Sequence, residues 1–354
     1  MKQSFMQSIR QMTWKKVFGL AVMGGVVASG TAWALTNSYV AREVESASRT
    51  GNVAVTSDTS ASGGSAVKFG QSATGCGGAH AIPAGPDPGW GCWPSPDTVG
   101  IPAGTTLTPY AGPMVLQAAQ NNYVIDGKII DGELRIVGAQ NVMIRNSRID
   151  GMIRNDLDNG GGSFTVMDSE VNVGAEPLTG IQEGNFTVLR SVVRGGARGV
   201  FCNRNATIQD SYIVGGFVDN SGVHHMSGAR YEQNCILRHN VIGCDAPDIP
   251  PDAGCSAGLT GYGDFQTIQY DIIERNLFLA GGGYCTYGGS SGQGGGKPFP
   301  NAHHVQFIDN WWARGSSNKC GFYGPITSFD SDAPGNVWQN NRYYPDGANV
   351  PPAN

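Results

Sequence analysis

The sequence predicts an all-β chain whose folded part is a right-handed parallel β-helix, a solenoid of stacked coils. Gly accounts for 53 of the 354 residues and charged residues for only 14%, a composition typical of turns and short strands. A phrase of alternating apolar residues that closes on Ser or Asn also recurs, at intervals from 20 residues (Ser191 to Ser211) to 36 (Asn240 to Asn276). So short a unit cannot bury its apolar face alone, so neighbouring units must stack in parallel, with right-handed crossovers.

The N-terminus, residues 1–35, has the composition of an export segment. Basic residues precede an apolar run over residues 17–35, and the small residues that end at Ala34 offer a cleavage site. Two interpretations stay open: a signal peptide that is removed, or a membrane anchor that is retained, because the apolar run is just long enough to span a bilayer. In both cases we expect the rest of the chain to be exported, either secreted or held at the cell surface.

Three regions follow the export segment. Residues 36–75 are rich in Ser, Thr, Ala and Gly without an apolar period, so we expect a flexible, disordered linker. Residues 76–120 combine clustered Pro and Gly with Trp90 and Trp93, and we expect them to cap the first coil, because an uncovered end would expose unpaired strand edges. Residues 121–354 then form the β-helix itself.

The recurring phrase has a mechanical explanation for its closing residue. We call these closing residues the marker positions: Ser147, Ser169, Ser191, Ser211, Asn240, Asn276, Asn310 and Asn341. Ser and Asn at a tight bend tolerate the left-handed backbone conformation, and their side chains can hydrogen-bond from coil to coil. We therefore interpret the marker positions as scaffold rather than as a site.

The eight cysteines, an even number, favour an oxidising compartment. The pairs that the spacing suggests are Cys76–Cys92, Cys244–Cys255, Cys202–Cys235 and Cys285–Cys320. Eight cysteines allow about 105 pairings, so the connectivity stays open at this point. No CxxC phrase occurs, which disfavours a zinc site.

The charge balance argues against a nucleic-acid partner. The net charge is -5 and the isoelectric point is about 5.7, with no run of Lys and Arg in the body of the chain to neutralise a phosphate backbone. We expect a monomer without bound nucleic acid.

Four phrases carry a resemblance to a known family. Gly-Ile-Pro-Ala-Gly-Thr-Thr-Leu begins at Gly100, Val-Ile-Asp-Gly at Val124, Val-Met-Ile-Arg-Asn-Ser at Val142 and Cys-Ile-Leu-Arg-His-Asn at Cys235. Over residues 95–345 the chain resembles the pectin-lyase-like superfamily of right-handed β-helix proteins. That superfamily contains polysaccharide lyases, hydrolases and non-catalytic surface proteins, so the resemblance implies an extracellular polysaccharide as the partner. The phrases that mark its pectin hydrolases and calcium-dependent pectate lyases do not occur here, so no catalytic residue is carried over.

A second strand precedes each recurring phrase, and its residues predict an outward-facing stripe. The resembled enzymes bind polysaccharide along this sheet. The first residue of each pair should point inward and the second outward. The pairs are Ile153-Arg154, Ile181-Gln182, Val200-Phe201, Val223-His224, Leu259-Thr260 and Phe322-Tyr323. An aromatic face for a sugar ring, a cation for a carboxylate and a titratable His then share one surface, which predicts a glycan-binding stripe.

β-Elimination on a uronate would assign roles to some of these residues. The reaction needs a base, a cation for the carboxylate and a donor for the leaving oxygen. We expect His224 as the base, Arg154 or Arg230 as the cation and Tyr323 as the donor, with His225 pointing inward.

Acidic residues leave two further chemistries open. Asp245, Asp248 and Asp252 lie in the loop between two cysteines, with Asp264 beyond it, and such carboxylates could bind Ca²⁺. A glycoside hydrolase would instead need two carboxylates that face one sugar, for which Glu183, Asp219 and Asp264 are the candidates.

Lys297 ends a Gly-rich run that resembles a phosphate-binding loop but lacks its first Gly and its final Ser or Thr. We interpret the run as a groove wall with Lys297 as a substrate contact. The function that we expect is binding and cleavage of an extracellular uronate polysaccharide by β-elimination. The alternatives are a non-catalytic surface adhesin or glycan-binding module, and a glycoside hydrolase.

Overall fold

In the computed structural model the chain divides into two compact units, residues 1–71 and 72–354. The described residues are 53–57, 65–69, 86–87, 91–292 and 296–353. The expected export segment, residues 1–35, lies outside them. No helix in the described ranges is long and apolar enough to cross a membrane.

In the first unit, strand β1 (Val53–Ser57) pairs antiparallel with β2 (Ser65–Phe69). The expectation that residues 36–75 lack ordered structure is therefore wrong for these two segments. Both contain Val at alternating or central positions, and β-branched residues favour strands even in a Ser-rich region.

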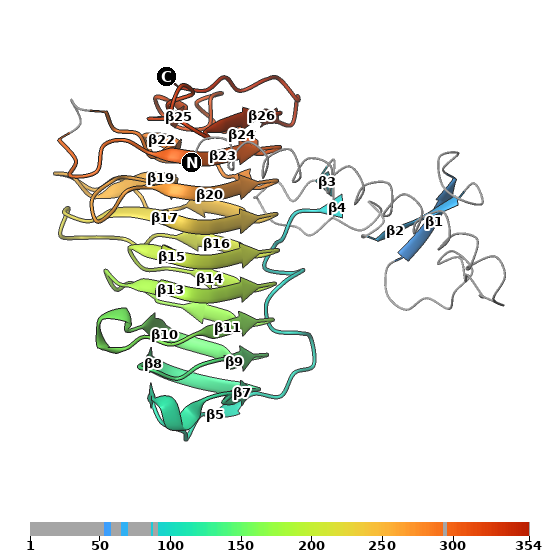
Figure 1. The fold of residues 1–354 in the computed structure, drawn as a ribbon, viewed down its shortest axis with the longest axis vertical. Coiled ribbons are helices and arrows are strands. Elements are labelled where there is room, and N and C mark those ends of the chain that lie inside the picture. The colour runs from blue at the N-terminus through green and yellow to red at the C-terminus, as the bar shows by residue number, and fades with distance from the viewer. Residues whose placement is uncertain (1–52, 58–64, 70–85, 88–90, 293–295, 354) are drawn as a thin grey trace, which may run out of the picture. The chain divides into compact units, whose positions relative to one another are not determined.

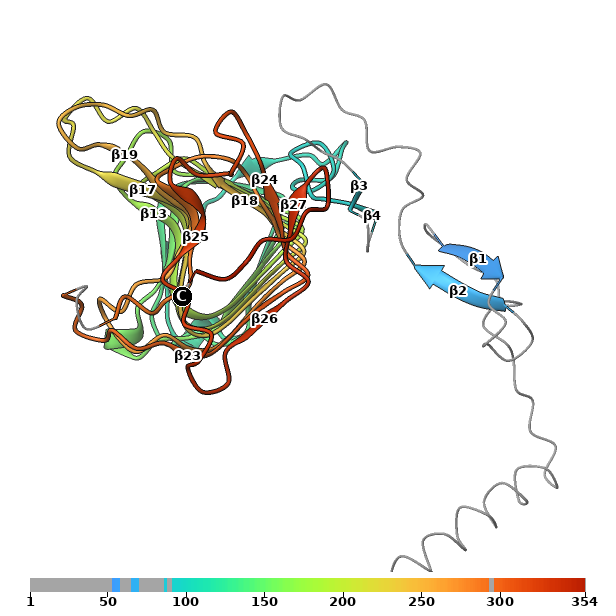
Figure 2. The ribbon, with the colours of Figure 1, turned by 90° about the horizontal axis from the view of Figure 1, so that it is seen from above.

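The second unit is a right-handed parallel β-helix, as the repeat predicts, with its strands joined in one 23-stranded hydrogen-bonded network (Figure 1). Seen along the solenoid, the strands form three faces, which we call sheets A, B and C (Figure 2). Sheet A contains β6 (Val115–Leu116), β19 (Gly254–Thr260), β22 (Tyr284–Tyr287) and β25 (Gly324–Thr327). Sheet B contains β7 (Val124–Asp126), β9 (Val142–Arg145), β11 (Phe164–Met167), β20 (Gln269–Glu274), β23 (His303–Ile308) and β26 (Val337–Gln339). Sheet C contains β5 (Thr108–Pro109), β12 (Glu170–Asn172), β14 (Val192–Arg194), β16 (Tyr212–Gly215), β18 (Val241–Cys244), β21 (Leu277–Phe278), β24 (Trp311–Ala313) and β27 (Arg342–Tyr344).

Long strands turn a corner and belong to two sheets. Those that pass from sheet C to sheet A are β8 (Lys128–Ile136) and β10 (Arg148–Asn155). Those that pass from sheet A to sheet B are β13 (Thr179–Leu189), β15 (Arg198–Gln209) and β17 (His225–Arg238). The remaining short elements are β3 (Pro86–Asp87), β4 (Gly91–Cys92), η3 (Ala118–Gln120) and η4 (Leu157–Asn159).

Rows of inward-facing side chains fill the solenoid. On sheet B one such row comprises Ile125, Ile144, Val166, Val188, Ile208, Leu237, Ile273 and Phe307, each at most 1% exposed. Alternation along each strand sends the intervening residues to the outer face. Burial of one such side chain is worth about 1.5–3 kcal/mol, so each added coil stabilises its neighbours.

The marker positions form a buried ladder between sheets B and C. Early in the stack the Ser147 N–H donates to Ser169 Oγ at 3.1 Å, and later the Asn240 N–H and Nδ2 both donate to Asn276 Oδ1 at 3.0 Å. The predicted coil-to-coil hydrogen bonding is thus confirmed. The left-handed conformation, however, falls on the preceding residue, as at Asp168 (φ 49°), because the marker side chain itself must point inward to reach the next coil.

The segment expected to cap the first coil, residues 76–120, reaches other coils of the solenoid as well. Trp93 packs against Trp311 and Tyr344 of the last coils, with ring centroids 6.2 and 5.2 Å away. Farther along, the Gly100 N–H donates to the Arg190 carbonyl, so this part runs along the outside of sheet C. Apolar residues on that outer face supply the surface that holds it.

Three of the suggested disulfides are present: Cys202–Cys235, Cys244–Cys255 and Cys285–Cys320. Cys92 is also disulfide-bonded, while Cys76, its suggested partner, lies outside the described residues. These bonds are compatible with an extracellular protein.

Candidate functional site

The outer face of sheet A carries the stripe that the sequence predicts over its first half. Strand register places Arg154 beside Gln182, Gln182 beside Phe201 and Phe201 beside Arg230. Arg230 in turn lies beside Thr260. These side chains therefore follow one another at successive inter-strand steps of about 4.8 Å.

His224 does not belong to the stripe. It lies before β17 in the loop between β16 and β17, where its Nδ1 is 2.9 Å from Asp219 Oδ2. Asp219 also accepts the N–H groups of Ser221, Val223 and His224. Val223, expected to point inward, is 62% exposed. The prediction was wrong because the extra residues of this coil precede the strand, which moves the stripe position to Arg230.

Tyr323 is displaced for a similar reason. It lies just before β25, and residues Ile326 and Thr327 of that strand hold the inward and outward positions. Phe322, expected inside, is 70% exposed. Leu259 pairs with Thr286, so Thr260 is followed along the stripe by Tyr287.

A pocket of about 530 Å³ lies against the C-terminal half of this stripe. Four of the predicted site residues line it: Arg230, Thr260, Asp264 and Lys297. Strands β15, β17, β19 and β22 provide its floor, and the segments that follow β19 and β22 provide its walls. His224 and Tyr323 are not among the residues that line it.

Two arginines place positive charge in the pocket. Arg198 donates through Nε to Ser227 Oγ at 3.3 Å and has no ion-pair partner among the described residues. Burial, and then the neighbouring Arg230, lower the pKa of Arg198 to about 10. Arg230 is held between the rings of Phe201 and Phe265, 5.4 and 4.8 Å from its guanidinium carbon. The pocket therefore contains a fixed cation available to an anionic ligand.

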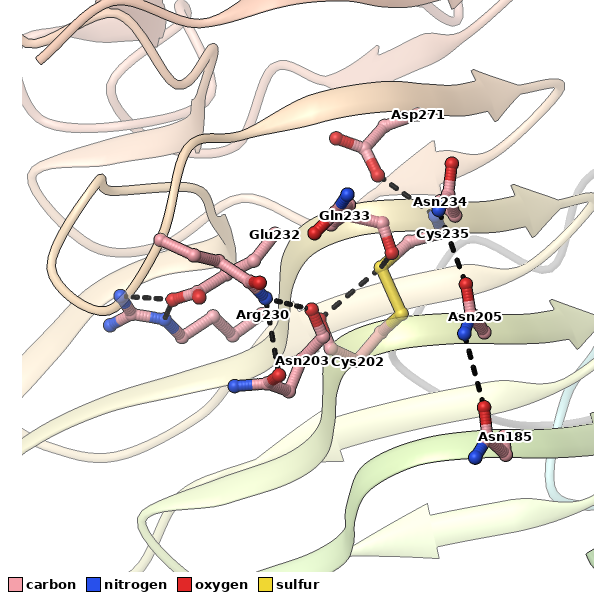
Figure 3. Close-up of a disulfide and its surroundings, with 11 residues drawn as sticks. Asn185, Cys202, Asn203, Asn205, Arg230, Glu232, Gln233, Asn234, Cys235 and Asp271 are labelled. Carbon is pink, nitrogen blue, oxygen red and sulfur yellow. Dashed lines mark hydrogen bonds and ion pairs between the residues drawn. A yellow bond between two sulfur atoms is a disulfide. The ribbon is translucent and has the colours of Figure 1, made fainter. Parts of the chain in front are cut away.

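Glu232 holds the Arg230 side chain in place. Its Oε1 accepts from Arg230 Nε at 3.0 Å and from Nη2 at 2.7 Å (Figure 3). The side chain is completely buried, and burial raises the pKa of Glu232 to about 7 even though Arg230 and Gln266 favour its ionised form. Because it is inaccessible, Glu232 positions the arginine rather than contacts a ligand.

Asp264 and Lys297 form the opposite wall. Lys297 Nζ lies 2.6 Å from Asp264 Oδ1 and 4.5 Å from the centre of the Tyr262 ring. Arg230 Nη2 donates to Asp264 Oδ2 at 2.9 Å. Burial opposes ionisation of Asp264, but these two cations outweigh it and lower the pKa of its carboxyl. Asp264 is therefore a carboxylate that holds the wall together.

His225, expected to point inward, is exposed and lines the pocket. Its Nε2 lies 3.0 Å from Asp252 Oδ2, which leaves Nδ1 without a partner among the described residues. A carboxylate that accepts a hydrogen bond from Nε2 orients the imidazole and sets the tautomer in which Nδ1 keeps its lone pair. The arrangement suits a general base.

Aromatic rings continue from the pocket toward the C-terminal coils. Tyr262 and Tyr287 are 4.7 Å apart, Tyr287 and Tyr284 6.2 Å, and Tyr284 and Tyr323 5.6 Å. Phe322 lies against Tyr323 at 4.8 Å, and both are more than 60% exposed. We call these five residues the aromatic track. Exposed faces of this kind stack on sugar rings.

The four aspartates proposed for Ca²⁺ have separate environments. Asp252 faces His225 and Asp264 faces two cations, while burial raises the pKa of Asp245. Among the described residues, no group of three or more His, Cys, Asp or Glu side chains could hold a metal ion.

Sequence reasoning missed Arg198, His225, Tyr262 and Tyr287 as residues that line the pocket. Arg198 lies three residues before the stripe residue Phe201, so counting back from the stripe would have drawn attention to it. No sequence signal places Tyr262, because it follows β19 in a segment without repeat. The comparisons with family models, curated proteins and solved structures found no match to this chain.

Proposed function

We propose that this chain is an exported protein of the pectin-lyase-like superfamily that binds an acidic polysaccharide across sheet A and cleaves it by β-elimination. The observation that carries the proposal is Arg198, a cation without a described carboxylate partner that lines the pocket beside Arg230. A guanidinium in a partly buried site binds a carboxylate through paired, charge-assisted hydrogen bonds. The aromatic track extends the same surface and suits the apolar faces of a sugar chain.

The pocket also offers groups for each step of an elimination on a uronate. Arg198 and Arg230 bind the carboxylate and make the neighbouring C5 proton more acidic. His225 Nδ1 takes that proton, the C4–O bond to the next sugar breaks, and a C4=C5 double bond forms. Lys297 Nζ gives a proton to the leaving oxygen.

A glycoside hydrolase has less support from this geometry. It needs two carboxyl groups on either side of one sugar. In the described part of the pocket the lining carboxylate is Asp264, which two cations hold ionised, and Glu232 is completely buried. Asp219, the other candidate, is occupied by the loop N–H groups and His224.

The test is a panel of uronate polymers with a neutral glucan as reference, scored both for binding and for the ultraviolet absorbance of unsaturated sugar ends. We expect product from at least one uronate polymer. His225→Ala should lower the rate by about 10²–10⁴-fold, as for loss of a general base, without loss of binding. His224→Ala is the matched control and should retain the rate.

A chelator should not change that rate, since the two arginines supply the positive charge. Binding without product would remove the elimination and leave the alternative, a glycan-binding surface protein. Equal binding to the neutral glucan would overturn the proposal as a whole.

A further inference from the structure

The corner between sheets A and B carries a ladder of asparagines in the earlier coils. Asn185, Asn205 and Asn234 adopt left-handed conformations, with φ of 54°, 53° and 52°. Asn205 Nδ2 donates to Asn185 Oδ1 at 3.1 Å, and Asn234 Nδ2 donates to Asn205 Oδ1 at 3.2 Å (Figure 3). Asn tolerates this conformation better than other residues with a Cβ, so the ladder suits the scaffold.

Tyr270 and His304 occupy the same corner position in the next two coils. Gln233 pairs with Gln269, and Gln269 pairs with His303, which places Asn234, Tyr270 and His304 in line. Both rings sit on left-handed backbone, with φ of 60° and 55°. Tyr rarely adopts this conformation, whereas His, like Asn, is among the residues enriched in it. The corner itself does not require a ring, since Asn fills it elsewhere.

The left-handed turn at His304 brings two imidazoles to one point. Side chains of successive strand residues normally point to opposite faces. Here His303 Nδ1 lies 2.9 Å from His304 Nδ1, with the two ring planes 82° apart. Neither Nδ1 has another hydrogen-bond partner within the described residues. In the tautomer that carries the proton on Nε2, both Nδ1 atoms keep a lone pair and can act as ligands.

We propose that His303 and His304 form a binding site for a divalent transition-metal ion with tetragonal coordination, Cu²⁺ being the best fit. Two metal–nitrogen bonds of about 2.05 Å at a right angle hold their nitrogens about 2.9 Å apart, whereas a tetrahedral angle would require about 3.3 Å. The observed separation matches the right angle. Square-planar or tetragonal nitrogen and oxygen ligation is typical of Cu²⁺ and Ni²⁺. Water completes the coordination.

Neighbouring residues hold His304 in this orientation. The Tyr270 ring packs against the His304 ring at 4.8 Å and against the His303 ring at 5.8 Å. Gly335 also lies close to this ring, since a Cβ there would come within 2.3 Å of His304 Cδ2. The Tyr270 ring and the Gly335 backbone thus restrict the imidazole, so little reorganisation is needed on binding.

The site is separate from the pocket of sheet A. Neither histidine lines that pocket, and they begin β23 after the segment that carries Lys297. Its occupation does not depend on the proposed polysaccharide chemistry. With two protein ligands it is an open site, which exposes several positions of the ion to exogenous ligands.

The test is a Cu²⁺ titration of the full chain without an added histidine tag, followed by calorimetry and by electron paramagnetic resonance. We expect one ion per chain and an axial spectrum with coupling to two nitrogens. His304→Asn restores the residue of the Asn ladder, so the variant should fold, and it should weaken binding by more than about tenfold, as should His303→Ala. His225→Ala, which removes an exposed histidine elsewhere, should leave binding unchanged.

Three results would overturn the proposal. The first is the absence of a stoichiometric site in the wild-type chain. The second is retention of the two-nitrogen spectrum in His304→Asn, and the third is its loss in His225→Ala. Circular dichroism of each variant shows that a loss of binding is not a loss of fold.

Discussion

Truncation of one marker asparagine tests how the solenoid is held together. Asn276 Oδ1 accepts from the Asn240 N–H and Nδ2, and its own Nδ2 donates to the Leu237 carbonyl at 2.8 Å and to Asn310 Oδ1 at 3.0 Å. In Asn276→Ala the buried Asn240 N–H loses its acceptor and the Leu237 carbonyl loses the amide donor. Each unsatisfied buried group costs about 1–3 kcal/mol, so the free energy of unfolding should fall by about 2–6 kcal/mol.

The matched control is Asn276→Ser, because earlier coils use Ser at the same position. There the Ser169 Oγ accepts the Ser147 N–H at 3.1 Å, so a serine at 276 should keep the partner of the Asn240 N–H. We expect Ser to cost about half as much as Ala. Urea unfolding followed by circular dichroism measures both losses of free energy. The slope of the unfolding free energy against urea concentration should stay unchanged. Equal losses for Ser and Ala, or an Ala loss below about 0.5 kcal/mol, would refute this account of the ladder.

Two further predictions concern a buried acid and the aromatic track. Burial raises the pKa of Asp271 well above its usual range. The folded chain therefore keeps a proton that the unfolded chain releases above about pH 4. As a result, the free energy of unfolding falls as pH rises, by at most about 1.4 kcal/mol per pH unit. The Asp271→Asn side chain can still accept the Cys235 N–H but does not titrate. The urea midpoint of this variant should therefore rise relative to that of the wild type between about pH 5 and pH 8. Equal pH dependence of the two midpoints would contradict this. Tyr323→Ala should weaken binding of long acidic chains by up to about tenfold, on the scale of one aromatic contact, and leave short oligomers unaffected in the same assay. Equal weakening for both lengths would exclude the track as an extended binding surface.

The sequence predicts the solenoid well because every coil repeats the same physical requirement. An inward apolar stripe and a polar side chain at one corner must recur in each turn, so the marker positions from Ser147 to Asn341 stand out as a series in the amino-acid sequence alone. The suggested pairs Cys202–Cys235 and Cys285–Cys320 join neighbouring coils, whereas Cys244–Cys255 is suggested by its closeness in sequence across one loop.

The candidate site is less predictable than the solenoid. The spacing between marker positions gives the number of residues in each coil, but it does not show at which corner the inserted residues lie. The insertion before β17 moves the stripe from His224 to Arg230, and the one before β25 moves it from Tyr323 to Thr327. Arg198 gains its significance from the absence of a described carboxylate partner, which is a property of packing rather than of sequence.

The measurement that tests the proposed site most directly compares Arg198→Gln with wild type on an acidic polysaccharide and on its methyl ester. Loss of a hydrogen bond to a charged group costs about 1.5–3 kcal/mol, so the wild-type chain should prefer the acid and Arg198→Gln should bind it about 10–150-fold more weakly. Binding of the ester should change little. If wild type binds acid and ester equally, or if Arg198→Gln retains the preference, the pocket on sheet A does not recognise a carboxylate.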